Sequence, residues 1–153
     1  MRQSFLLRDR DDTKRIAEIL GKRMRCGDVV TLAGDLGAGK TTFAQFLIQS
    51  LSANAVEVTS PTFTIVQTYP VMLADGQAVE LYHYDLYRIE HPSALIELGF
   101  EDAVANLALI EWPERAASLN LPVTLALTFT LGENEARHLT IEGHDARWSD
   151  IAL

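Results

Sequence analysis

The sequence contains a single cysteine, no long hydrophobic run and few basic residues, and each shortage excludes a class of protein. One cysteine, Cys26, can form neither an internal disulfide nor a cysteine-based zinc cluster. Its place at the end of a helical pattern predicts a buried or half-buried side chain. No apolar stretch approaches the roughly 18 residues of a membrane-spanning helix, and the N-terminal residues show no signal-peptide core. We therefore expect a cytoplasmic protein with no membrane partner.

Positive charge is also scarce. The chain carries 13 Lys and Arg residues against 21 Asp and Glu residues, which gives a formal net charge of −8. Proteins that bind nucleic acid alone normally present a basic face to the phosphate backbone. The composition therefore argues against direct binding of DNA or RNA by this chain.

The length and the hydrophobic content fit one globular domain. The chain has 153 residues, of which 48% are hydrophobic, and single domains usually contain about 100–200 residues. The sequence shows no internal repeat, low-complexity segment or linker. We expect a single domain that spans residues 1–153.

The order of the predicted elements indicates an α/β fold. Apolar residues at helical spacing predict a first helix, capped by Asp12 and ended by Gly27. The apolar run 29–33 has no alternation, which is typical of a strand covered on both faces, and a second helix follows to about residue 52. A short helix from Ser93 to Leu98 is also predicted. Further strands are expected at 5–7, 56–58, 64–69, 79–84, 107–110, 123–131 and 136–142. Turn residues at 74–76 and 132–134 predict two hairpins, one that joins 64–69 to 79–84 and one that joins 123–131 to 136–142. These elements predict a mixed β-sheet flanked by helices.

A phosphate-binding loop joins the buried strand to the second helix. The pattern G-x-x-x-x-G-K-[ST] is complete, and glycines allow the backbone to wrap closely around phosphate oxygens. The start of the helix directs free N–H groups at the same anion, Lys40 can place a charge on the phosphates, and the hydroxyl of Thr41 can bind Mg²⁺. We expect the side chain of Asp35 to point outward. The predicted nucleotide-binding residues are Gly34, Asp35, Leu36, Gly37, Ala38, Gly39, Lys40, Thr41 and Thr42.

The sequence indicates which nucleotide base is bound only through a motif that it lacks. GTPases usually carry an N-K-x-D motif that reads guanine, and this sequence has none. ATP is therefore the favoured ligand.

Two acidic residues stand where strands are expected to end. Asp85 follows the strand at 79–84 and Glu111 follows the strand at 107–110. Ligands of open α/β sheets gather beyond the carboxyl ends of the strands, so both acids are candidates to bind Mg²⁺ or to orient an attacking water. Each could instead be a solvated acid. His83 is expected to be a packed strand residue, and Arg137 a solvated one.

The segment Thr59-Ser60-Pro61-Thr62 places three hydroxyl groups on a loop after the second helix. In nucleotide-dependent proteins, such a loop often senses the γ-phosphate. An ordinary turn explains the same residues equally well, and the sequence leaves both interpretations open.

Four sequence blocks occur in a fixed order and together resemble one family. They are residues 34–42, Ser60-Pro61-Thr62-Phe63, Tyr84-Asp85-Leu86-Tyr87-Arg88 and Glu111-Trp112-Pro113-Glu114. The combination resembles the TsaE (YjeE) family, the small bacterial ATPases of tRNA threonylcarbamoyladenosine synthesis. The phosphate loop alone is shared with many proteins, whereas the Asp-Leu-Tyr-Arg and Glu-Trp-Pro-Glu blocks are far more specific.

The resemblance implies a fold, ligands and partners. It implies a P-loop NTPase-like domain that binds ATP and Mg²⁺, with hydrolysis that is weak or depends on partners. The implied partners are the TsaD and TsaB proteins, which transfer a threonylcarbamoyl group to adenosine 37 of tRNA. This chain would then contact tRNA only through these partners.

The resemblance also implies roles for individual residues. Thr41 and Glu111 would hold Mg²⁺, and Asp85 would support hydrolysis. Thr62 would lie on a switch-like loop, and Trp112 and Glu114 would lie near the nucleotide.

Two other functions use the same loop. A small-molecule kinase usually closes an arginine-rich lid over the phosphates, but Arg115, Arg137 and Arg147 are scattered here. A nucleotide-dependent binding module with little hydrolysis would need the loop alone. Asp85 and Glu111 favour an ATPase over such a module.

Overall fold

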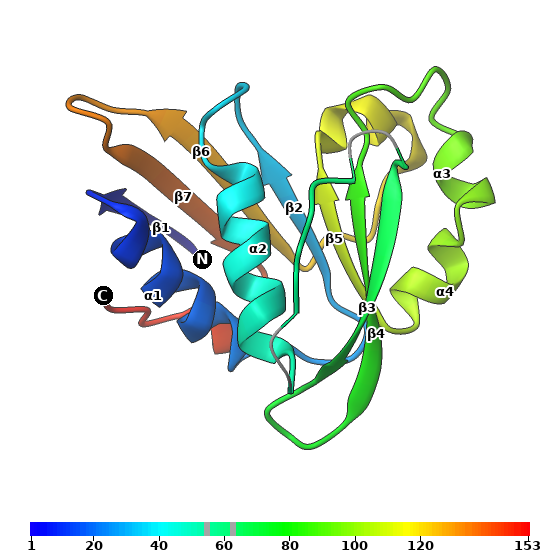
Figure 1. Ribbon diagram of the computed structural model, residues 1–153, viewed down its shortest axis with the longest axis horizontal. Helices are drawn as coiled ribbons and strands as arrows, with labels where there is room; N and C mark the ends of the chain where they lie inside the picture. Colours follow the sequence, from blue (N-terminus) through cyan, green and yellow to red (C-terminus); the bar gives the residue numbers. More distant parts are fainter. Residues whose placement is uncertain (54–55, 62–63) are drawn as a thin grey trace.

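Seven strands form one mixed sheet at the centre of the computed structural model, which describes residues 1–53, 56–61 and 64–153 (Figure 1). Across the sheet the strands lie in the order β1-β7-β6-β2-β5-β4-β3. Their bounds are β1 Arg2–Leu7, β2 Val29–Ala33, β3 Val66–Met72, β4 Ala78–Asp85, β5 Leu107–Glu111, β6 Leu125–Leu131 and β7 Arg137–Gly143. The helices are α1 Arg10–Gly21, α2 Lys40–Leu51, α3 Ala94–Glu97, α4 Phe100–Val104 and the 3₁₀ helices η1 Pro113–Leu119 and η2 Ala146–Trp148. The predicted α/β fold with a mixed sheet flanked by helices is confirmed.

The central strands β6, β2, β5 and β4 run parallel to one another. The outer strands β3 and β7 are antiparallel to their inner neighbours, and β1 is antiparallel to β7. Every residue of β5 and nearly every residue of β2 is buried, as their unbroken apolar runs predict. The parallel direction brings the carboxyl ends of β2, β5 and β4 to the same edge of the sheet.

Helices cover both faces of this sheet (Figure 1). On one face, α1 and α2 close the larger core, in which Phe43 and Leu47 of α2 join Leu32 and Leu109 of the strands. On the other face, α3, α4 and η1 close a smaller core around Ile110. The larger core holds α2 against the sheet, and this contact fixes the start of α2 relative to the strand ends.

The second helix is confirmed, whereas both predicted ends of the first helix are wrong. Asp9 caps α1 by accepting a hydrogen bond from the backbone N–H of Asp12, because Asp12 is turned inward to other partners. The helix ends at Gly21 and not at Gly27. Gly27 has a φ of +98° and lies in the following turn, where its N–H donates to the carbonyl oxygen of Asn106.

The two predicted hairpins are confirmed as the antiparallel pairs β3–β4 and β6–β7. The predicted strand at 56–58 is wrong: in the described part of the chain this segment pairs with no strand. Its Val58 is buried in the larger core, and the carbonyl oxygen of Val58 accepts a hydrogen bond from Gln45 of α2. The β-branched residues of this segment therefore serve core packing and not sheet pairing.

Cys26 is exposed, which contradicts the predicted burial. Its thiol lies beyond the end of α1 and donates to the carbonyl oxygen of Ala105. Among the described residues, no helix is both long and apolar enough to cross a lipid bilayer.

Asp12 fastens the first turn of α1 to the chain that precedes it. Its side chain is only 2% exposed. The carboxylate accepts hydrogen bonds from the side chain and the backbone N–H of Arg8, and it pairs with Arg15. These contacts, led by the side chain of Arg8, lower the pKa of Asp12 from 3.8 to about 2. A lowered folded-state pKa stabilises the fold above the unfolded value, and this stabilisation is lost as the pH falls from about 4 towards 2.

We expect Asp12→Ala to lower the free energy of unfolding at pH 7 by about 1–3 kcal/mol, because it removes a charged acceptor that holds the backbone and the side chain of Arg8. The difference from wild type should shrink as the pH falls from 5 to 3. Urea unfolding at these pH values measures it. Asp11→Ala removes an exposed acid from the same turn and is the matched control; a loss for Asp12→Ala that does not vary with pH would contradict the role given to its charge.

Candidate functional site

The loop between β2 and α2 has the backbone shape that the glycine pattern predicts. Gly34, Gly37 and Gly39 all have positive φ angles, of +140°, +77° and +110°. A Cβ atom on Gly34 would lie 2.4 Å from the carbonyl oxygen of Phe129, so no side chain fits there. Gly39 precedes α2 and offers no side chain to cap it. The first N–H groups of α2 are therefore left for an external acceptor.

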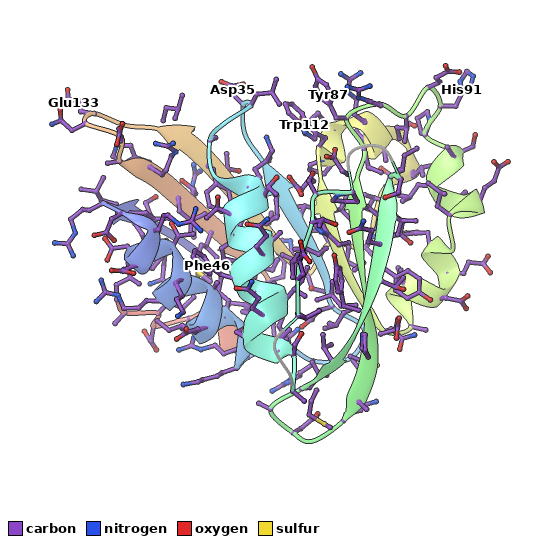
Figure 2. The ribbon with its side chains drawn as sticks, viewed as in Figure 1. Asp35, Phe46, Tyr87, His91, Trp112 and Glu133 are labelled. Carbon is purple, nitrogen blue, oxygen red and sulfur yellow. The ribbon has the colours of Figure 1, made fainter. Side chains whose placement is uncertain are left out.

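A cavity of about 450 Å³ opens beside this loop. Residues from six places in the sequence meet there, and they include most of the predicted site. Asp35 is exposed at the tip of the loop, as predicted, while Tyr87 and Trp112 lie at the same end of the sheet (Figure 2). The lining residues are Leu36, Gly37, Ala38, Gly39, Lys40, Thr41, Thr42, Ser60, Asp85, Tyr87, Arg88, Glu111, Trp112 and Arg137.

Lys40 lies inside the loop. Its Nζ donates to the carbonyl oxygens of Gly34 and Asp35, the latter at 3.1 Å, and lies 3.8 Å from the centre of the Trp112 ring. Burial lowers the pKa of Lys40, and the negative charges of Glu111, Glu114, Asp85 and Asp35 oppose this shift. An anion in the cavity would compensate the cost of burying this ammonium group.

Glu111 and Asp85 end neighbouring strands and lie directly opposite each other in the β4–β5 register. Glu111 is 1% exposed and Asp85 is 6% exposed, so neither is the solvated acid of the alternative interpretation. The Oε1 atom of Glu111 accepts a hydrogen bond from the hydroxyl of Thr41 at 3.0 Å. Asp85 accepts a hydrogen bond from the backbone N–H of Tyr87.

The Thr41–Glu111 pair fits a magnesium ion. Neighbouring corners of an octahedron with ligands at 2.0–2.1 Å lie about 2.9 Å apart, and Mg²⁺ commonly takes only one or two protein ligands with phosphate and water. The observed 3.0 Å separation matches this spacing. Among residues 1–53, 56–61 and 64–153, no group of three or more His, Cys, Asp or Glu side chains could hold a metal ion. The structure thus offers two adjacent oxygens for an ion shared with a phosphate.

Trp112 forms part of the cavity wall, whereas Glu114 does not line the cavity. The backbone of Trp112 is left-handed, with a φ of +60°, and its ring lies 4.8 Å from that of Tyr87. Glu114 is exposed on η1 and acts on Lys40 only through its charge. Thr62 and Phe63 lie outside the described residues, although Ser60 of the same loop lines the cavity.

Sequence reasoning missed Arg137 as a site residue. It was expected to be solvated on its strand, but it lines the cavity next to Gly39. The reason is topological: β6 runs parallel to β2, so the hairpin returns the first residue of β7 to the edge where the loop lies. The antiparallel pairing expected for 123–131 and 136–142 contains half of this signal, whereas the parallel pairing of β6 with β2 was not predicted.

A second cavity of about 690 Å³ adjoins the first and shares Gly39, Thr42 and Arg137 with it. Its other walls come from the segment that leads into α1 and from the β6–β7 turn, which includes Asn134. The two cavities therefore form a continuous surface on both sides of the start of α2.

Comparison with known proteins identifies the family. A family model described as "Threonylcarbamoyl adenosine biosynthesis protein TsaE" matches residues 7–139. A protein from Rickettsia felis with the name tRNA threonylcarbamoyladenosine biosynthesis protein TsaE is 39% identical over 133 residues, which cover 86% of this chain and 75% of the relative. A protein of the same name from Nostoc sp. is 34% identical over 154 residues, which cover 96% and 90% of the two chains.

A solved structure agrees with this result. The crystal structure of YdiB from Bacillus subtilis superposes with a TM-score of 0.72 at 29% sequence identity, and the match covers 97% of this chain and 89% of that one. All residues that line the first cavity fall within residues 7–139, the range that the family model matches. This chain belongs to the TsaE family of tRNA threonylcarbamoyladenosine biosynthesis proteins.

Proposed function

We propose that this chain binds ATP with Mg²⁺ and hydrolyses it in support of threonylcarbamoyl transfer to adenosine 37 of tRNA by the TsaD and TsaB proteins. The observation that carries the proposal is the hydrogen bond between Thr41 and Glu111 at the mouth of a glycine loop. It brings a hydroxyl and a carboxylate together beside the loop, and a magnesium ion bound to a phosphate in the loop would need such a pair.

The phosphates of the nucleotide would occupy the loop. Lys40 would leave the carbonyl oxygens of Gly34 and Asp35 and donate to phosphate oxygens instead. The N–H groups at the start of α2 would bind the same oxygens. The nucleoside would extend into the second cavity, past Gly39 and Thr42, where Asn134 and the segment before α1 offer polar groups.

Hydrolysis needs a water held in line with the terminal phosphate. Asp85 lies opposite Glu111 on the same face of the sheet and lines the cavity, so we assign it to orienting this water. When bound, Mg²⁺ neutralises charge that develops on the phosphate oxygens. Arg137 adds a positive charge from the other wall of the cavity. Thr62 remains a proposed phosphate sensor.

Lys40→Ala should weaken ATP–Mg²⁺ binding by ten- to a hundredfold, because hydrogen bonds to charged groups contribute about 1.5–3 kcal/mol. Titration calorimetry with a slowly hydrolysed ATP analogue measures this change. Lys22→Ala removes an exposed lysine beyond the far end of α1 and serves as the control. Equal affinity of the Lys40 variant and wild type would show that the nucleotide does not use the loop.

Asp85→Asn and Glu111→Gln should separate turnover from metal binding. We expect Asp85→Asn to keep the ATP affinity and to lose turnover by about a hundredfold or more, the range found for groups that act on the attacking nucleophile. Glu111→Gln should instead raise the Mg²⁺ concentration needed for half-maximal turnover. Phosphate release across a Mg²⁺ titration measures both effects.

The control for these two variants is Glu101→Gln, an exposed acid on α4. If Asp85→Asn and Glu111→Gln give the same Mg²⁺ dependence and the same maximal rate, the assignment of separate roles is wrong.

Partner dependence provides a further test. We expect slow phosphate release by the chain alone, an increase on addition of TsaD and TsaB, and no such increase for Lys40→Ala. In a gel shift at physiological salt, the chain alone should not bind tRNA near the ~10⁻⁸ M typical of specific complexes, because its net charge is −8. If TsaD and TsaB do not change the rate of phosphate release, an ATPase that acts without these two proteins would be favoured.

A further inference from the structure

The side chain of His83 contacts Glu111, the candidate metal ligand. Its Nε2 atom lies 2.7 Å from Oε2 of Glu111, and the two side chains are 0% and 2% exposed. An ionised carboxylate only accepts hydrogen bonds, so Nε2 donates in this contact. Nδ1 of His83 has no hydrogen-bond partner among the described residues, and Glu111 is thus the one polar partner of the ring in this part of the chain.

The sheet register explains why this pair meets. Asp85 lies opposite Glu111, and His83 lies opposite Leu109, two residues earlier on each strand. His83 and Glu111 are therefore diagonal neighbours on the same face, at a distance that long side chains can bridge. The carboxylate is then held from two sides, with Oε1 bonded to Thr41 and Oε2 bonded to His83.

We propose that His83 is a positioning residue that fixes the orientation of the Glu111 carboxylate and thereby sets the affinity of the site for a divalent cation. This inference rests on the proposed function. Because His83 bonds to Oε2, Oε1 stays directed at Thr41. Oε1 and the hydroxyl oxygen of Thr41 therefore keep the spacing of adjacent metal ligands. A partner that orients a metal ligand in this way typically changes metal affinity or activity by 10–100-fold when it is removed.

The position of Asp85 increases the need for such a donor. Two carboxylates directly opposite each other on one face of a sheet repel, and this repulsion favours rotation of Glu111 away from the site. A buried carboxylate oxygen without a donor is also unfavourable. Without His83, both effects would turn the Glu111 carboxylate away from Thr41.

The test compares His83→Leu, which removes the donor, with His83→Gln, whose amide nitrogen can replace Nε2. Binding of an ATP analogue is measured by calorimetry across a Mg²⁺ titration, and again in EDTA. We expect His83→Leu to raise the Mg²⁺ concentration at half-maximal effect by 10–100-fold with unchanged binding in EDTA. We expect His83→Gln to remain within about threefold of wild type.

Two further variants separate positioning from packing. Leu81→Val trims a buried residue of the same strand and face, and it should lower the melting temperature without moving the Mg²⁺ midpoint. In a Glu111→Ala background, His83→Leu should have no further effect on the midpoint, because His83 acts through Glu111. An additional shift in that background would overturn the proposal.

A crystal structure of nucleotide-free His83→Leu gives a readout that does not depend on nucleotide binding. We expect the Glu111 carboxylate to have left Thr41, and an unmoved carboxylate would overturn the inference.

If wild type shows no Mg²⁺-dependent nucleotide binding, the proposed function fails, and this structure still decides the role of His83. If wild type binds and His83→Leu has the same Mg²⁺ midpoint, the inference alone fails. Equal losses in His83→Leu and His83→Gln, with binding in EDTA also reduced, would assign His83 to packing only.

Discussion

The parallel pairing of β5 with β2 on one side and with β4 on the other determines which side chains meet at the glycine loop. It brings three strand ends to the start of α2, and with them Glu111, Asp85 and the loop itself. A shift of one residue in either pairing would move these acids to the opposite face of the sheet. The unbroken apolar runs of β2 and β5, buried on both faces, anchor these pairings in the core.

The charges of the site become consistent only when the site is considered with a bound anion and cation. Without them, two buried carboxylates lie opposite each other, and a buried ammonium group has backbone carbonyls as its acceptors. Such arrangements are costly for a fold and are found where a protein binds or transforms a ligand. A phosphate chain with a divalent ion, as proposed above, would supply charges of both signs.

Much of this arrangement could be predicted from the sequence because it depends on short-range patterns. The glycine loop, the buried strands beside it and the two hairpins have local signals, and the structure confirms them. The acids at 85 and 111 could be placed because ligands gather at the carboxyl ends of parallel strands. The first-helix cap was misplaced because Asp9 and Asp12 are chemically equivalent candidates, and only the contacts of Arg8 and Arg15 distinguish them.

The remaining features depend on register, which no local pattern specifies. His83 was correctly predicted to be packed, but its contact with Glu111 follows from a diagonal relation between two strands that are far apart in the sequence. Arg137 reaches the loop only because β6 lies next to β2. The valines at 56 and 58 indicated a strand, yet Val58 packs in the larger core, and its carbonyl oxygen bonds to the side chain of Gln45 on α2.

The position of Lys40 has a consequence for the thermodynamics of ligand entry. The ammonium group bonds to the carbonyl oxygens of Gly34 and Asp35, which are acceptors within its own loop. Binding of a phosphate to this ammonium group would then exchange one set of acceptors for another. The affinity for such a ligand would report the difference between two sets of hydrogen bonds, so a modest affinity would be compatible with strong individual contacts. The internal acceptors also tie the side chain of Lys40 to the loop, which would limit the ordering entropy that binding costs.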